Sequence, residues 1–251
     1  MVKGRSKIVD MIFRQFKNAV SGFSKLLDVV TNGINKLDPK DNTRQRVVAA
    51  LILIPIVVYA IFYSVSFFII LAITAAIVMS SEWIDIIRKS DEQDKWRLIG
   101  LVYILIPTYS VIKIRLIDSD ILFWMFAIIW TTDIFAFFAG RILGGAKLAP
   151  KISPNKTWSG LIGGVAASGV IGFISSFLFS GGVAFFVTIS VFLSLLEQVS
   201  DLLESKFKRI FGVKDSGNII PGHGGVLDRL DGMMLVAPFV LFLITFFPGK
   251  F

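Results

Sequence analysis

Four long stretches of this sequence contain no charged residue, and they constrain the fold more than any other feature. They span residues 47–81, 98–112, 157–196 and 232–249. A helix needs about 20 apolar residues to cross the hydrocarbon core of a bilayer. Buried core helices of a soluble domain would not account for a run as long as 157–196. The sequence therefore predicts an all-α integral membrane protein.

Two of these stretches are too long for one helix each and contain turn signals. The first is expected to break near Ser64–Ser66, and the third at Ser180-Gly181-Gly182. Each break predicts a helical hairpin. With single spans at 98–112, 121–140 and 233–247, we expect about seven transmembrane helices. The predicted parts are a basic amphipathic N-terminal segment (1–45), N-terminal transmembrane helices (46–120) and a second transmembrane domain (121–251) with cytoplasmic loops 141–157 and 201–231.

Lysine and arginine are distributed unevenly between the loops. Short loops rich in these residues tend to stay in the cytoplasm. With seven spans, residues 1–46, 84–97, 141–157 and 201–231 lie on one side and hold 23 of the 26 Lys and Arg residues. We therefore expect these loops at the cytoplasmic face of a bacterial inner membrane or an equivalent membrane.

The segment before the first span has its own pattern. Apolar residues recur at helical spacing from Ile8 to Leu37, and the basic residues fall largely at other positions. This pattern predicts a basic amphipathic helix that lies on anionic lipid. A partner-binding helix and a targeting segment are the alternatives. The chain has no cysteine, so disulfides and thiolate metal ligands are excluded.

Residues 205–231 contain three features that suit phosphate chemistry. Lys208, Arg209 and Lys214 are cations next to the membrane, where they can bind phosphate oxygens. Glycines at 222, 224 and 225 surround His223 and allow backbone N–H groups to form an anion-binding nest. Asp228 and Asp231 are spaced to share one helical face, which predicts a Mg²⁺ site. Each feature alone has a structural explanation as an anchor, a turn or a helix cap.

This stretch resembles the signature of the CDP-diacylglycerol synthases, also called phosphatidate cytidylyltransferases. An upstream segment is similar to the same family, so the resemblance covers about residues 130 to 240; residues 1–45 do not resemble it. The matching positions are Ser205, Lys208-Arg209, Lys214-Asp215, Pro221-x-His223-Gly224-Gly225 and Asp228-Arg229-x-Asp231, and upstream Asp133, Gly140-Arg141, Lys147 and Ser153-Pro154-x-Lys156-Thr157.

The resemblance implies transfer of CMP from CTP to phosphatidate, giving CDP-diacylglycerol and pyrophosphate in phospholipid biosynthesis. The implied cofactor is one or two Mg²⁺ ions, with a monovalent cation as an option, and the partners are the two substrates and membrane lipid. We expect no nucleic-acid partner, and a homodimer is an open alternative. The expected catalytic residues are Asp228, Asp231, Lys208, Arg209 and Lys214; the metal ligands are Asp228, Asp231, Asp201 and Asp215; the substrate-binding residues are Asp133, Arg141, Lys147, Ser153, Lys156, Thr157, Ser205, Gly222, His223, Gly224, Gly225 and Arg229.

Three acids lie in or beside apolar helices, where a charge is expensive and indicates function. Asp133 and Asp201 are assigned to the site, and Asp201 falls at helical spacing with Ser205 and Lys208. Glu197 is more easily explained by a structural hydrogen bond between helices. We do not expect His223 to act as a general base, because a phosphate monoester with a second pKa of about 6 is already largely ionised at neutral pH.

Two other functions remain as alternatives. A polyprenol-type lipid kinase would also use CTP, but its substrate would attack the γ-phosphorus and release CDP. A channel or transporter would use Asp133 and Glu197 for ions, and that function would leave the glycine-rich segment unexplained.

Overall fold

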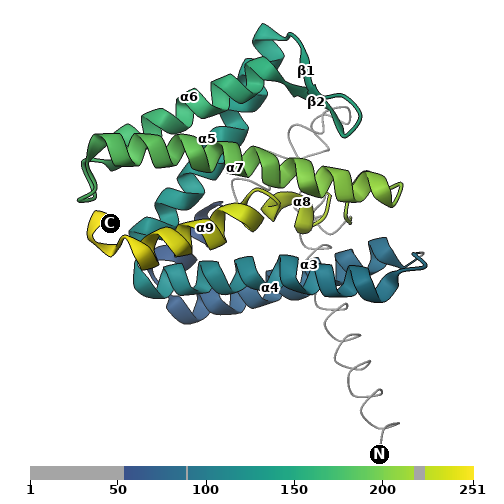
Figure 1. Ribbon diagram of the computed structural model, residues 1–251. Coiled ribbons are helices and arrows are strands. Elements are labelled where there is room, and N and C mark those ends of the chain that lie inside the picture. Colours follow the sequence, from purple (N-terminus) through teal and green to yellow (C-terminus); the bar gives the residue numbers. More distant parts are fainter. Residues whose placement is uncertain (1–53, 89, 218–223) are drawn as a thin grey trace, which may run out of the picture.

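The computed structural model describes residues 54–88, 90–217 and 224–251. It consists almost entirely of helices (Figure 1). Residues 54–62 are helical and precede the named elements. In chain order these are α3 (Val65–Ile87), α4 (Gln93–Ile117), α5 (Ser119–Leu143), β1 (Lys147–Ala149), β2 (Ser153–Thr157), α6 (Trp158–Ser175), α7 (Gly182–Ile210), α8 (Leu227–Leu230), α9 (Met233–Phe246) and the 3₁₀ turn η1 (Pro248–Lys250).

Helices α3 to α7 are long and apolar enough to cross a membrane, which makes five candidate spans in the described part of the chain. Helix α9 is apolar but has 14 residues, and at 1.5 Å per residue it extends only about 21 Å. The protein is therefore a multi-pass membrane protein. The first predicted span begins outside the described residues, and the amphipathic segment 1–45 lies wholly outside them. The total of seven transmembrane helices and the amphipathic segment therefore stay predictions.

Both predicted helix breaks are present. Ser64 caps α3, and its side chain accepts a hydrogen bond from the Phe67 N–H at 3.2 Å. Helix α7 starts at Gly182, whose φ of 76° lies in the left-handed region that glycine adopts without strain. The turn residues therefore end one helix and start the next where the sequence predicts.

Helices α5 and α6 pack closely because small residues line their contact. A Cβ atom at Gly160 would lie 2.7 Å from the carbonyl oxygen of Ala136, and one at Gly164 would lie 2.8 Å from that of Thr132. Glycines at such positions allow membrane helices to approach backbone to backbone. Helix α7 packs against α6, α5 and α9.

A buried hydroxyl cluster joins α5, α6 and α7. Thr132 Oγ1 lies 2.7 Å from Ser168 Oγ and donates to Ser194 Oγ at 3.0 Å. All three side chains are fully buried. Because Thr132 precedes Asp133, and Ser194 lies one turn before Glu197, the cluster fixes the positions from which these two acids extend.

One predicted loop contains strands, and one predicted loop boundary needs correction. The loop 141–157 contains an antiparallel pair of strands, with Lys147 opposite Thr157 and Ala149 opposite Ser153, so the protein is not purely α-helical. Helix α7 continues past the apolar stretch to Ile210, so residues 201–210 are helical and not loop. The reason is that buried positions, most of them polar, continue at helical spacing from Glu197 to Lys208, which keeps the helix packed beyond its apolar part.

Candidate functional site

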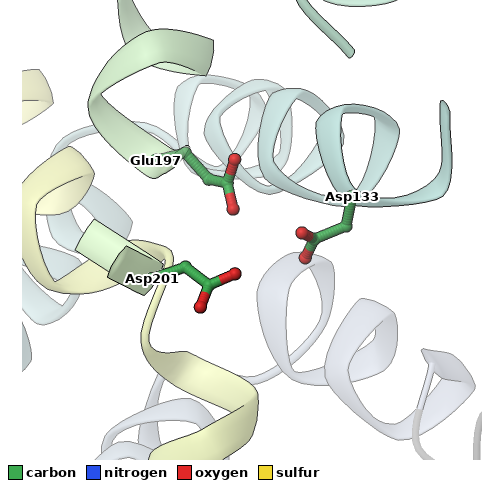
Figure 2. A group of neighbouring side chains, drawn as sticks. All are labelled: Asp133, Glu197 and Asp201. Atoms are coloured by element: carbon green, nitrogen blue, oxygen red, sulfur yellow. The ribbon is translucent and has the colours of Figure 1, made fainter. Parts of the chain in front are cut away.

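Three carboxylates from two helices meet beside the hydroxyl cluster. Asp133 of α5 and Glu197 and Asp201 of α7 point toward one another (Figure 2). One oxygen from each lies within 4.8 Å of the others. Glu197 is buried, Asp201 is half-buried and Asp133 is exposed. Three oxygen ligands this close together can coordinate a hard divalent cation.

A second acid group shares Asp201 with the first. It consists of Asp201, Glu204 and Asp231, again with one oxygen each within 4.8 Å. Glu204 is 1% exposed. Within the described residues its Oε1 has no hydrogen-bond partner, and its Oε2 lies 2.7 Å from Lys208 Nζ. A buried carboxylate oxygen without a partner is costly, and a bound cation would satisfy it.

Asp231 is the member of this group that lies between α8 and α9. Its side chain accepts a hydrogen bond from the Gly232 N–H at 2.8 Å. Burial, together with the nearby charges of Asp201 and Glu204, raises the pKa of Asp231 well above its ordinary value. A cation in this group would oppose that effect, because it would stabilise the ionised carboxylates.

Two lysines contact the acids, one from β2 and one from α7. Lys156 of β2 forms an ion pair with Asp201 and donates to Gln198 Oε1 at 2.9 Å. Burial by itself lowers the pKa of Lys156, but the Asp201 carboxylate raises it above the ordinary lysine value. The ammonium group of Lys156 therefore stays charged at neutral pH. Lys208 of α7 contacts both Glu204 and Asp228, the latter at 2.6 Å.

Asp228 is engaged by the chain itself. Its carboxylate accepts hydrogen bonds from the backbone N–H groups of Ser216 at 2.9 Å and Gly225 at 2.8 Å, and from Lys208. Burial opposes ionisation, but these donors lower the pKa of Asp228 below its ordinary value. Asp228 and Asp231 thus have different partners. Within the described residues, the two acid groups contain Asp201 and Asp231 but neither Asp228 nor Asp215.

The other predicted phosphate ligands are spread over the surface around the acids. Arg209 donates to the carbonyl oxygens of Ile152 at 3.2 Å and Val213 at 2.9 Å, so it ties α7 to the β1–β2 turn. Lys214 and Asp215 are exposed. Arg229 is exposed on α8 and close enough to act electrostatically on Asp133.

Residues of the β1–β2 hairpin and its surroundings fall into structural and exposed positions. Thr157 caps α6 and accepts from the Gly160 N–H at 3.1 Å, and Ser205 donates to Asp201 Oδ1 at 3.2 Å. Arg141 lies over the Phe137 ring at 5.8 Å. Lys147 is exposed and Ser153 is half-buried. Gly224 has a φ of 82°, and Gly222 and His223 lie outside the described residues.

Sequence reasoning did not select Glu204 or Glu82, and it favoured a structural role for Glu197. Glu197, Asp201 and Glu204 occupy positions i, i+4 and i+7 of one helix, and that spacing puts all three on one face. The spacing was therefore a signal that could have found both glutamates of α7. Glu82 gives no such signal, because its partners are distant in the sequence.

The chain is similar to known proteins over the range that holds these residues. The model of the cytidylyltransferase family matches residues 98–247, a range that contains both acid groups and both lysines. A phosphatidate cytidylyltransferase of Rickettsia bellii (strain RML369-C) is 45% identical over 215 residues, which cover 81% of this chain and 91% of the relative. The enzyme of the same name from Rickettsia felis (strain ATCC VR-1525 / URRWXCal2) is 42% identical over 217 residues, covering 82% and 93%. That of Brucella abortus biovar 1 (strain 9-941) is 46% identical over 149 residues, covering 57% and 54%. The chain belongs to the cytidylyltransferase family.

Proposed function

We propose that this protein is a phosphatidate cytidylyltransferase, which converts CTP and phosphatidate to CDP-diacylglycerol and pyrophosphate. The proposal rests on the similarity to enzymes of that name and on one structural observation. Two acid groups that share Asp201 are flanked by Lys156 and Lys208. This arrangement suits a reaction between two polyanions, which depends mostly on positioning and electrostatics.

In the reaction, a phosphate oxygen of phosphatidate forms a bond to the α-phosphorus of CTP, and the bond from that phosphorus to the β-phosphate oxygen breaks. Pyrophosphate leaves with the electron pair of that bond. The attacking phosphate is already largely ionised near neutral pH because its second pKa is about 6, so no general base is required. Lys156 and Lys208 supply fixed positive charge against the repulsion between the substrates.

The residues present fit divalent cations. The carboxylates of Asp201, Glu204 and Asp231 would hold one Mg²⁺ ion. Those of Asp133, Glu197 and Asp201 would hold a second cation, which is either Mg²⁺ or a monovalent ion. The buried Oε1 of Glu204, which has no hydrogen-bond partner within the described residues, supports this assignment. A bound Mg²⁺ supplies charge neutralisation at the phosphate oxygens. The sequence-based assignment of Asp228 and Asp215 as metal ligands stays a prediction. We propose instead that Asp228 stabilises the loop through its hydrogen bonds to the N–H groups of Ser216 and Gly225.

The site is proposed to lie at the cytoplasmic face of a bacterial inner membrane or equivalent, in a protein of seven spans. The α3–α4 turn, the β1–β2 hairpin and the C-terminal end of α7 lie at one end of the bundle, and the α6–α7 turn and the C-terminus lie at the other (Figure 1). The first end carries the basic loops, which the positive-inside tendency places in the cytoplasm. Soluble CTP would then reach the acids from the aqueous side, and the lipid headgroup would reach them at interface depth.

The test is product analysis with purified protein in detergent. CTP, phosphatidate and Mg²⁺ should yield equal amounts of CDP-diacylglycerol and pyrophosphate. Asp231→Asn should abolish both products, and Asp85→Asn, which changes an exposed acid of α3, should not. Release of CDP, with no pyrophosphate, would instead support a lipid kinase and would refute the proposed reaction.

A further inference from the structure

Helix α3 contributes a buried carboxylate that lies outside the range matched by the family. Glu82 is 3% exposed, and the matched range begins at residue 98. Its Oε1 accepts from the Val226 N–H at 2.9 Å, and its Oε2 accepts from the Leu227 N–H at 2.8 Å and from Ser216 Oγ at 3.3 Å. A buried acid is tolerated when donors surround it in this way.

The loop around Glu82 is shaped to admit its carboxylate. We define the loop stems as residues 216–217 and 224–228. A Cβ atom at Gly217 would lie 2.8 Å from Glu82 Oε1, and one at Gly225 would lie 2.6 Å from the same oxygen. Since real Cβ atoms are not found so close to another heavy atom, a side chain at either position would displace the stem or the carboxylate. The two glycines and the glutamate therefore form one fitted contact.

The same stems hold Asp228, so Glu82 is connected to the proposed site. Ser216 uses its hydroxyl toward Glu82 and its N–H toward Asp228, the latter at 2.9 Å. Asp228 in turn pairs with Lys208, which pairs with Glu204 of the second acid group. Within the described residues, this chain of contacts runs from α3 to the acids without interruption.

We propose that Glu82 is a positioning residue of the enzyme, which fixes the loop stems and, through Asp228, the ammonium group of Lys208. The proposal deepens the proposed function and rests on it. Glu82 is not a member of either acid group, and the proposed role requires no contact between it and a substrate. Helix α3 lies before the matched range 98–247 and packs against α8, and Glu82 supplies the hydrogen bonds to Val226 and Leu227 at that contact.

The chemistry of the contact predicts that charge and shape both matter. Glutamine has the size of glutamate but only one acceptor oxygen, so its NH₂ group would face a backbone N–H of Val226 or Leu227. The NH₂ group and that backbone N–H are both donors and cannot bond to each other, so the buried N–H loses its acceptor. Glu82→Gln should therefore release the stems although it preserves volume.

The first experiment measures turnover by purified variants that elute as single species in detergent. Glu82→Gln and Glu82→Ala should lower kcat about tenfold or more, as expected for loss of charge-assisted hydrogen bonds. The KM for phosphatidate should change little, because the acids and Lys156 keep their places. Asp85→Asn removes an exposed acid from the same helix and should leave kcat unchanged. Wild-type protein without pyrophosphate release would refute the proposed function, and wild-type kcat per folded molecule in Glu82→Gln would refute the role of Glu82.

The second experiment tests the coupling directly. The atoms nearest to a Cβ at Gly217 all belong to Glu82. Gly217→Ala should therefore lower kcat in the wild-type background and have little further effect in Glu82→Ala, so the two effects should not add. Additive effects would overturn the proposal. If Glu82→Ala does not fold, the same comparison in Glu82→Gln should show a reduced effect of Gly217→Ala, and a full effect there would be the contradicting result.

Discussion

The ammonium group of Lys208 lies 2.6 Å from Oδ1 of Asp228 and joins helix α7 to the short helix α8. The same nitrogen lies 2.7 Å from Oε2 of Glu204. One buried lysine therefore neutralises an acid of the proposed metal site and the acid that holds the loop stems. These two ion pairs hold the loop stems at a fixed position relative to the second acid group.

Removal of this lysine should affect folding as well as turnover. Lys208→Gln leaves Glu204 and Asp228 without their shared cation, and loss of one partner of a buried ion pair costs about 3–5 kcal/mol. We expect a lower unfolding temperature in detergent and no measurable turnover. Lys206→Gln changes an exposed lysine of the same helix and should unfold like the wild type. An unfolding temperature of Lys208→Gln equal to that of Lys206→Gln would show that the pair contributes nothing to stability.

Asp231 and Asp228 should respond differently to the same substitution. Asp231→Asn removes one of three crowded carboxylates, so without divalent cations its stability should equal or exceed that of the wild type, while turnover falls by orders of magnitude. Asp228→Asn loses the ion pair with Lys208 and one of the two oxygens that accept from Lys208, Ser216 and Gly225, so its stability should fall with its turnover. Thermal unfolding in a chelator and pyrophosphate release distinguish the two. A loss of stability in both variants would place Asp231 among the structural acids.

The stability contributed by Asp228 should depend on pH in a defined direction. Its folded pKa is lowered by Lys208 and by the N–H groups of Gly225 and Ser216. The stabilisation is therefore present above the unfolded pKa, about 3.9, and is lost as pH falls through the lower folded value. The difference in unfolding free energy between wild type and Asp228→Asn should be constant above about pH 5 and should shrink only at lower pH. A difference that already shrinks between about pH 7 and 5 would contradict a lowered pKa.

The absence of cysteine allows the proposed topology to be tested with single introduced thiols. Ser90→Cys and Ser153→Cys lie at the α3–α4 turn and in β2, and both should react with a membrane-impermeant maleimide only from the cytoplasmic side. Ser180→Cys, exposed in the α6–α7 turn, should react only from the opposite side. Labelling of Ser90 and Ser153 from opposite sides would rule out a shared cytoplasmic face.

The sequence by itself determined the membrane class and the helix breaks, and it selected Asp133, Asp201 and Asp231, three acids of the two groups, as candidates for the site. Uncharged runs such as 157–196 require an apolar surrounding whatever their partners are. Ser64 and Gly182 start helices α3 and α7 through local backbone preferences. Asp201 and Ser205 lie on one helical face because of their spacing alone. The phosphate-binding role of His223 and the amphipathic helix in segment 1–45 were also inferred from the sequence alone, and both stay predictions.

Only the tertiary structure decided how those residues are paired. Asp133 meets Glu197 because close packing through Gly160 and Gly164 brings α5 to α6, and α7 packs against both of these helices. The spacing of Asp228 and Asp231 does not reveal that one binds the loop and Lys208 and the other joins Asp201 and Glu204. Glu82 finds donors at Val226 and Leu227 far along the chain. Local spacing fixes which face a side chain occupies, but the packing of distant helices fixes what that face meets.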